Sequence, residues 1–208
     1  MTYDYSFFGF VMQQKKGILD QFSEFLIQER PQRIIEIGMG YGGLSIGLAL
    51  YSYLNNIDYT TYDIELRHGI AERSKEVIEL LGKKLIIADI FELEDEMARL
   101  YQIDGKVLTL CDGGNKIKEL DIFSKYIKSN DIIMAHDYHA IYFPPPVEFV
   151  NNQPVFAKWP NVDYIPDYSW PFCEVYDSAI QHIIDREKLE KVYAKLFEEY
   201  NWVCLMKK

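Results

Sequence analysis

Four acidic side chains lie at the ends of short runs of apolar, aromatic or β-branched residues. Asp63 closes the run DYTTYD, Asp89 follows KLIIA, Asp112 follows KVLTLC and Asp137 follows IIMAH. If these runs are parallel strands, their carboxyl ends lie at one edge of a sheet, which is where open α/β sheets bind ligands. Carboxylates at such an edge can accept hydrogen bonds from sugar hydroxyls or bind a cation. The spacing therefore predicts a polar site built from strand ends.

A glycine-rich segment, IIEIGMGYGG, occupies residues 34–43 and precedes an apolar run. Glycines between a buried strand and a helix let a ligand approach the main chain, although they can also make a tight turn without any ligand. Glu36 lies inside the strand and would repel a pyrophosphate. The third glycine also comes two residues after the second, whereas dinucleotide-binding motifs space them by three. The segment favours a cationic ligand without phosphate, such as S-adenosylmethionine.

The elements that position these residues alternate along the chain. Apolar spacing predicts a helix over 16–30, which ends before Pro31. Strand and helix then repeat five times from residue 33, which predicts a parallel α/β sheet with helices on both faces. The predicted strands are 33–38, 58–65, 84–89, 106–114 and 131–137, and the helices between them are 44–55, 69–82, 90–102 and 117–127.

The end of the chain is expected to return to regular structure after an irregular stretch. Residues 140–173 hold seven of the eight prolines and many aromatic side chains. A long aromatic-rich loop is typical of a lid, a substrate wall or an oligomer contact, so residues 140–176 are interpreted as a lid or insertion. A change of phase near Asp185 predicts two helices or a kink, and a final strand follows at 202–208. The aromatic side chains that would wall an acceptor pocket or bury a homodimer face are Trp159, Tyr164, Tyr168 and Trp170.

Composition limits the classes of partner. The 22 basic residues against 32 acidic ones give a net charge of −10, which disfavours nucleic acid and anionic membranes as partners. Three widely spaced cysteines without a C-x-x-C pair fit neither a disulfide framework nor a zinc site. No stretch resembles a signal peptide or a membrane span. We expect a single cytoplasmic domain over 1–208 with an N-terminal helical segment at 1–32.

Three segments in order resemble the first three motifs of class I S-adenosylmethionine-dependent methyltransferases: EIGMGYGG, TYDIE and IIAD. The region from FFGF to GGLSI (7–46) resembles more narrowly the cephalosporin-hydroxylase-like and macrocin-type O-methyltransferases. The resemblance covers roughly residues 6–138 and the final strand. It implies a Rossmann-like, doubly wound, mostly parallel seven-stranded sheet with helices on both faces and an aromatic-rich insertion after strand five.

The resemblance also assigns residues to the cofactor. Glu36 and the glycines shape the methionine end of the pocket, Asp63 or Glu65 holds the ribose, and Asp89 with the backbone of Ile90 contacts adenine. The whole implied cofactor-binding set is Glu36, Gly38, Gly40, Gly42, Asp63, Glu65, Asp89, Ile90 and Asp112.

Related O-methyltransferases that use a divalent ion take ligands from the ends of strands four and five. The matching positions here are Asp112, His136 and Asp137. Histidine at 136, where an acid is commoner, suits Mg²⁺ less than a softer metal, or no metal. The ion would lower the pKa of the acceptor hydroxyl. The same carboxylates could instead contact substrate or cap helices, and Asn115 could be a ligand or a substrate contact.

The proton acceptor is predicted among three residues of the same region. His139 and His136 have a suitable ordinary pKa, whereas Lys116 would need its pKa lowered by its neighbours. The catalytic set expected from the sequence is His139, Asp112 and Lys116.

The expected activity is methyl transfer from S-adenosylmethionine to a small hydroxylated acceptor, sugar-like or phenolic, with assistance from Mg²⁺ or another divalent metal. A non-catalytic S-adenosylmethionine-binding interaction protein is one alternative. An oxygenase is another, but its iron site would crowd His136, Asp137 and His139 into four consecutive residues. A nicotinamide-dependent oxidoreductase is disfavoured by Glu36 and by the glycine spacing.

Overall fold

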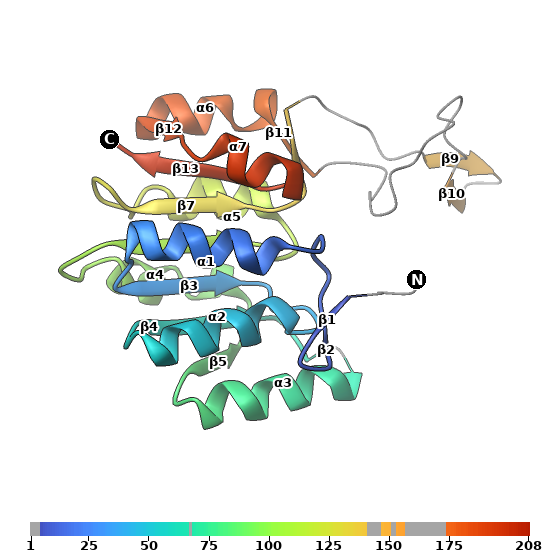
Figure 1. Cartoon of the computed structure of the whole chain (residues 1–208). Helices are drawn as coiled ribbons and strands as arrows, with labels where there is room; N and C mark the ends of the chain where they lie inside the picture. Colours follow the sequence, from blue (N-terminus) through green and yellow to red (C-terminus); the bar gives the residue numbers. More distant parts are fainter. Residues whose placement is uncertain (1–4, 67, 141–146, 151–152, 157–173) are drawn as a thin grey trace.

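The computed structural model describes residues 5–66, 68–140, 147–150, 153–156 and 174–208. Its centre is a seven-stranded sheet with the order β12-β13-β7-β6-β3-β4-β5 (Figure 1). Strands β3 to β7 of this sheet are parallel, whereas β13 is antiparallel to β7 and β12 is antiparallel to β13. The prediction of a mostly parallel sheet is therefore confirmed. The strands are β3 (Arg33–Ile37), β4 (Asp58–Asp63), β5 (Lys84–Ile87), β6 (Val107–Cys111), β7 (Ile132–Ala135), β12 (Leu189–Lys191) and β13 (Val203–Lys207).

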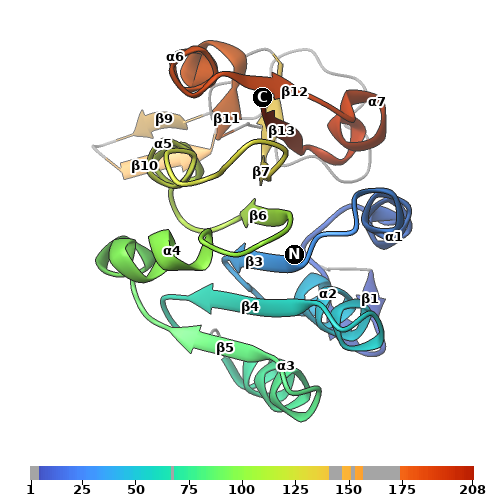
Figure 2. The same cartoon turned by 90° about the vertical axis from the view of Figure 1, so that its left-hand side faces the viewer.

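Helices cover both faces of the sheet, as Figure 2 shows. Strand β3 is buried on both sides, because Ile34 packs in the core under one set of helices and Ile35 in the core under the other. An uninterrupted apolar run such as this is what a central parallel strand requires. One face carries α1 (Ile18–Glu29), α2 (Gly43–Leu54), α3 (His68–Leu80) and α7 (Ala194–Phe197); the other carries α4 (Glu94–Leu100), α5 (Lys116–Phe123) and α6 (Asp177–Glu187).

Local sequence signals set several helix ends. Helix α1 ends at Glu29, and the next residue, Arg30, adopts a left-handed backbone with φ 48° and directly precedes Pro31. Asn115 starts α5, since its side-chain oxygen accepts a hydrogen bond from the N–H of Lys118. Asp89 caps the short 3₁₀ helix η1 (Ile90–Glu92) in the same manner.

Two sequence predictions about helices are corrected. The predicted helix at 90–102 is divided into η1 and α4. The phase change near Asp185 does not join two helices: α6 ends at Glu187, Lys188 turns the chain with φ 54°, and β12 follows. Leu189 is apolar because it lies in this edge strand, opposite Lys207 of β13. Only the single turn of α7 and the 3₁₀ helix η2 (Glu198–Tyr200) remain helical beyond it.

Shorter elements surround the sheet. The N-terminal segment, predicted to be helical, begins with a hairpin of β1 (Ser6–Phe7) and β2 (Phe10–Val11) that contacts α2 and α3. Strand β8 (Tyr138–His139) pairs in parallel with β11 (Val175–Tyr176), and β9 (Val147–Val150) pairs with β10 (Gln153–Phe156). The aromatic side chains of the predicted lid, at positions 159, 164, 168 and 170, lie outside the described residues. Among the helices that are described, none is both long and apolar enough to cross a membrane.

Candidate cofactor and acceptor site

A cavity lies where the strand order reverses. From β3 the chain winds outward through β4 and β5, and it then returns to the other side of β3 through β6 and β7. Ligands of open α/β sheets bind at this point, outside the carboxyl ends of the strands. The cavity has a volume of about 440 Å³ and is lined by the loops that follow β3, β4, β5, β6 and β7.

The glycine loop after β3 needs its first glycine for the chain's own packing. Gly38 has φ 89°, and a Cβ atom there would overlap the carbonyl oxygen of Asp112 in the loop after β6. Only glycine combines a left-handed backbone with such a close approach. The glycine pattern therefore serves the crossing of two loops as well as the cavity that they enclose.

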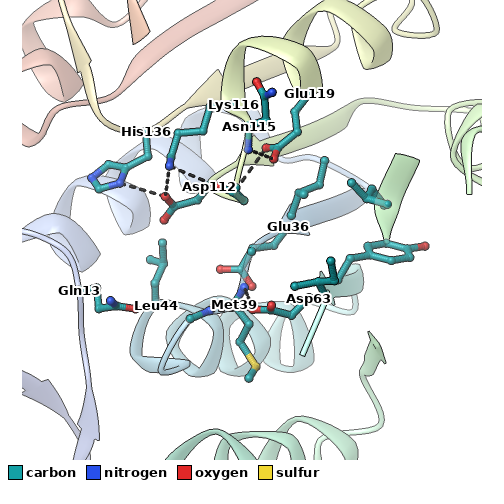
Figure 3. A pocket seen from close by; sticks show the side chains of 18 of the residues that line it. Gln13, Glu36, Met39, Leu44, Asp63, Asp112, Asn115, Lys116, Glu119 and His136 are labelled. Atoms are coloured by element: carbon teal, nitrogen blue, oxygen red, sulfur yellow. Dashed lines mark hydrogen bonds and ion pairs between the residues drawn. The ribbon is translucent and has the colours of Figure 1, made fainter. Parts of the chain in front are cut away.

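The side chain of Asp63 is hydrogen-bonded to the glycine loop. Its Oδ2 accepts hydrogen bonds from the backbone N–H groups of Met39 at 2.9 Å and Gly40 at 3.0 Å, and Figure 3 shows it beside Met39. A bound pyrophosphate would need these same N–H groups and would face the Asp63 charge. The loop therefore does not fit a dinucleotide. Glu65, the alternative ribose ligand, is exposed and does not line the cavity.

Glu36 lies in the cavity wall and points inward from β3 (Figure 3). It is 1% exposed, and its Oε2 accepts a hydrogen bond of 2.5 Å from the hydroxyl of Tyr59. Burial raises the pKa of Glu36 to about 7, although the hydrogen bond from Tyr59 acts in the opposite direction. A cation next to this carboxylate would stabilise its ionised form.

Asp89 and Ile90 line the cavity at the end of β5, where the resemblance implied adenine contacts. One carboxylate oxygen of Asp89 accepts a hydrogen bond from the N–H of Phe91 at 2.9 Å. Ile90 is buried and gives this part of the wall an apolar surface. The apolar surface of Ile90 suits the face of an adenine ring, and the second carboxylate oxygen of Asp89 can accept a hydrogen bond from its edge.

The loops after β6 and β7 bring together the three residues of the implied metal set. Atoms of Asp112, His136 and Asp137 that could bind a metal lie within 4.8 Å of one another. Nδ1 of His136 is 3.0 Å from Oδ1 of Asp112 and 3.4 Å from Oδ1 of Asp137. Asp137 has φ 54°, an uncommon backbone conformation for a residue other than glycine. Two carboxylates and an imidazole form a mixed oxygen and nitrogen donor set that fits a divalent ion.

Lys116 lies beside this set. Its Nζ is 3.1 Å from Oδ2 of Asp137, 2.8 Å from Oε2 of Glu174 and 3.9 Å from Oδ1 of Asp112. Burial opposes its charge, but the three carboxylates raise the pKa of Lys116 above its ordinary value. The prediction that Lys116 acts as a base required a lowered pKa, whereas these contacts raise it. Asp112, His136 and Asp137, with the neighbouring Glu174, form a group that is called the acid corner below. The ammonium group of Lys116 balances the carboxylates of this corner and would compete there with a metal ion.

The two histidines have different places. Burial opposes protonation of His136, but Asp112 and Asp137 together raise its pKa. His139 lies in β8, is exposed and is not part of the cavity wall, so the structure does not bring the predicted base to the site. Within the described residues, the candidate metal cluster contains only one histidine, which leaves the 2-His-1-carboxylate set of an oxygenase unassembled.

The lining residues that were not found from the sequence include four with amide or carboxyl side chains: Gln13, Gln14, Glu119 and Glu174. Glu119 is buried and accepts hydrogen bonds from the backbone N–H groups of Gly113 and Asn115, each at 3.3 Å. Burial raises the pKa of Glu119 to about 7. Its spacing from Asn115, one helical turn, is the only sequence signal among the four. Asn115 also lines the cavity, beside its role in capping α5.

A comparison with protein-family models finds no match, and neither does a comparison with curated proteins. Solved structures are similar at low identity. The apo structure of CmcI is 18% identical over 64% of this chain and 57% of its own, with a TM-score of 0.49. An O-methyltransferase family protein from Burkholderia thailandensis is 11% identical over 93% of this chain and 55% of its own, also with a TM-score of 0.49. The O-methyltransferase TomG from Streptomyces achromogenes, in complex with SAM, is 15% identical over 58% of this chain and 55% of its own, with a TM-score of 0.44. The similar part thus spans less than two thirds of each of these proteins, and the description of the site rests on this chain's own geometry.

Proposed function

We propose that the chain is an S-adenosylmethionine-dependent methyltransferase that methylates a hydroxyl group of a small acceptor. The observation that carries the proposal is the combination of Asp63 and Glu36 at the glycine loop. Asp63 occupies the loop N–H groups that a phosphate would need, and the buried Glu36 carboxylate lies beside them. A nucleoside ligand at this switch point must therefore lack phosphate and carry positive charge.

The residues of the cavity have separate roles in this proposal. Glu36 faces the ammonium group of the methionine part. Oδ1 of Asp63, which accepts only a long hydrogen bond of 3.4 Å from the N–H of Glu65, accepts a second one from the ribose. Ile90 packs against adenine, with Asp89 at its edge. When bound, the cofactor supplies an electrophilic methyl group, and the enzyme positions the acceptor oxygen and excludes water.

The acid corner receives the acceptor. Asp112 and Asp137 line the same cavity as the glycine loop, so an acceptor held there lies next to the cofactor end of the pocket. Their oxygens, with Nδ1 of His136, would hold a divalent metal, which would lower the pKa of a hydroxyl bound to it. Lys116 contacts Asp137 and Glu174, and together with His136 it outweighs burial and holds the pKa of Asp137 below its ordinary value.

The charges of the corner support an acceptor without phosphate. Asp112, Asp137 and Glu174 supply three carboxylates, against the ammonium of Lys116 and the imidazole of His136. Without a metal ion these charges would repel an anionic acceptor, and a divalent ion bound there would bring them close to balance, which suits an uncharged acceptor. A sugar-like or phenolic hydroxyl compound is the acceptor class that we propose. The net charge of −10 supports a small-molecule partner over nucleic acid, and we keep a cytoplasmic homodimer as part of the proposal.

Calorimetric titration with S-adenosylhomocysteine tests the cofactor assignment. Because Asp63 also holds the glycine loop, its replacement by alanine would damage the loop itself; Asp63→Asn keeps an oxygen for the loop and removes the carboxylate. We expect a dissociation constant of about micromolar for the wild type and clearly weaker binding for Asp63→Asn. Glu65→Gln is the matched control, since Glu65 is exposed outside the cavity, and it should bind as the wild type does. Absence of binding to the wild type, or equal loss in both variants, would refute the assignment.

A further inference from the structure

Two adjacent glutamines between β2 and α1 reach different halves of the cavity. The side-chain oxygen of Gln13 accepts a hydrogen bond from the N–H of Tyr41 in the glycine loop at 3.3 Å. Gln14 instead contacts the acid corner, where its Nε2 donates to Oδ2 of Asp112 at 2.7 Å. Figure 3 shows Gln13 near Leu44, at the start of α2 and away from the corner. The dipeptide therefore serves the cofactor loop through one residue and the acceptor corner through the next.

The orientation of the Gln14 amide follows from its partners. Nε1 of Trp202 donates to Oε1 of Gln14 at 3.0 Å, and an indole N–H can only donate. The amide oxygen must then face Trp202, and the amide nitrogen must face Asp112. An ionised carboxylate can only accept, so this arrangement satisfies each group. Gln14 is 8% exposed and Trp202 is fully buried, which keeps both hydrogen bonds away from water.

This arrangement decides which oxygen of Asp112 faces the corner. Gln14 occupies Oδ2, while Oδ1 is turned towards Nδ1 of His136 at 3.0 Å. The Trp202 ring also packs on the His136 ring, with 4.8 Å between the ring centroids. Gln14 and Trp202 thus contact two of the three donor groups of the corner, Asp112 and His136.

We infer that Gln14 is a positioning residue that, with Trp202, presents Oδ1 of Asp112 and the ring of His136 to a divalent cation. Partners of this kind fix the direction of a ligand's lone pair, and their loss typically weakens metal binding by about 10- to 100-fold. The inference rests on the proposed function, in which the corner lies beside the cofactor. The inference goes beyond the proposed function because it assigns Gln14 to cation binding and Gln13 to cofactor binding.

The test measures two ligands on three proteins. Binding of Mn²⁺ and of S-adenosylhomocysteine is titrated calorimetrically on the wild type, Gln14→Ala and Gln13→Ala. We expect Gln14→Ala to weaken Mn²⁺ binding by about tenfold or more and to leave S-adenosylhomocysteine binding unchanged. Gln13→Ala should do the reverse. Trp202→Phe, which keeps an aromatic ring on His136 and removes only the N–H donor, should weaken Mn²⁺ binding less than Gln14→Ala does.

Two results would overturn the inference: a wild type that binds no Mn²⁺, and Gln14→Ala with wild-type Mn²⁺ affinity. Loss of both ligands in both glutamine variants would indicate a general folding defect, and Gln14→Met, of similar volume, then separates packing from hydrogen bonding. Wild-type Mn²⁺ affinity in Gln14→Met would overturn the inference. Failure of the wild type to bind S-adenosylhomocysteine refutes the proposed function instead, so the two failures are distinguishable.

Discussion

Replacement of Glu36 by glutamine tests the electrostatics of the cofactor end. The variant keeps an oxygen that can accept the hydrogen bond from Tyr59 and removes the titratable carboxyl group. Glu36 is almost completely buried, and burial raises its pKa to about 7 from an ordinary value of 4.5. The substitution therefore changes charge and little else in the cavity wall.

The structure gives the direction and the size of the effect on stability. A carboxyl group whose pKa is raised on folding stabilises the fold fully below its unfolded pKa, and this stabilisation is lost as the pH rises through the folded pKa. A shift from 4.5 to about 7 corresponds to roughly 3 kcal/mol of unfolding free energy lost across that range. Glu36→Gln lacks this loss, so its stability relative to the wild type should increase as the pH rises from about 4.5 to above 7.

Binding of a cationic ligand has the opposite dependence on pH. If the ammonium group of the cofactor binds next to ionised Glu36, wild-type affinity should rise about tenfold between pH 6 and pH 8, as the carboxyl group ionises. In Glu36→Gln the affinity should be lower and flat over the same range. Calorimetric titration with S-adenosylhomocysteine at several pH values measures both curves, and urea unfolding at the same pH values measures stability. A flat wild-type curve, or the same slope in both proteins, would refute the role given to Glu36.

Two further substitutions probe the loops and the corner. Gly38→Ala should lower the free energy of unfolding by about 2 kcal/mol or more, because alanine is strained at φ 89° and its Cβ would overlap the Asp112 carbonyl oxygen. Urea titration measures this change, and a stability equal to that of the wild type would contradict the described loop crossing. Lys116→Gln should cost about 3 kcal/mol by removing the ammonium group that pairs with both Asp137 and Glu174. Mn²⁺ should raise the melting temperature of this variant more than that of the wild type, because the competing ammonium is gone; equal shifts with Mn²⁺ would show that lysine and metal do not share the corner.

Much of the framework could be predicted from short-range patterns. Strand-end acids are legible because parallel strands place their carboxyl ends at one edge, so Asp63, Asp112 and Asp137 all line the cavity. The helix after Asn115 was found for a similar reason, since its apolar spacing is local. Edge strand β12 was missed because three residues give too little alternation to distinguish a strand from a helical turn.

The rest of the site depends on contacts between distant parts of the chain. Lys116 pairs with Glu174, 58 residues away, as well as with the nearer Asp112 and Asp137, and these carboxylates together outweigh burial and raise its pKa. Gln14 contacts Asp112 and Trp202, which are separated from it by 98 and 188 residues. Neither glutamine belongs to a motif, and a neutral amide shows its role only through its partners. Charge and hydrogen-bonding roles of this kind need the tertiary structure.

The central claim is that the cavity at the ends of β3 and β6 binds S-adenosylmethionine. A crystal structure of the chain grown with saturating S-adenosylhomocysteine tests it most directly. We expect the ligand in this cavity, with its amino group beside Glu36, its ribose on Asp63 and its adenine against Ile90. Ligand bound elsewhere, or a cavity that remains empty under these conditions, would contradict the claim.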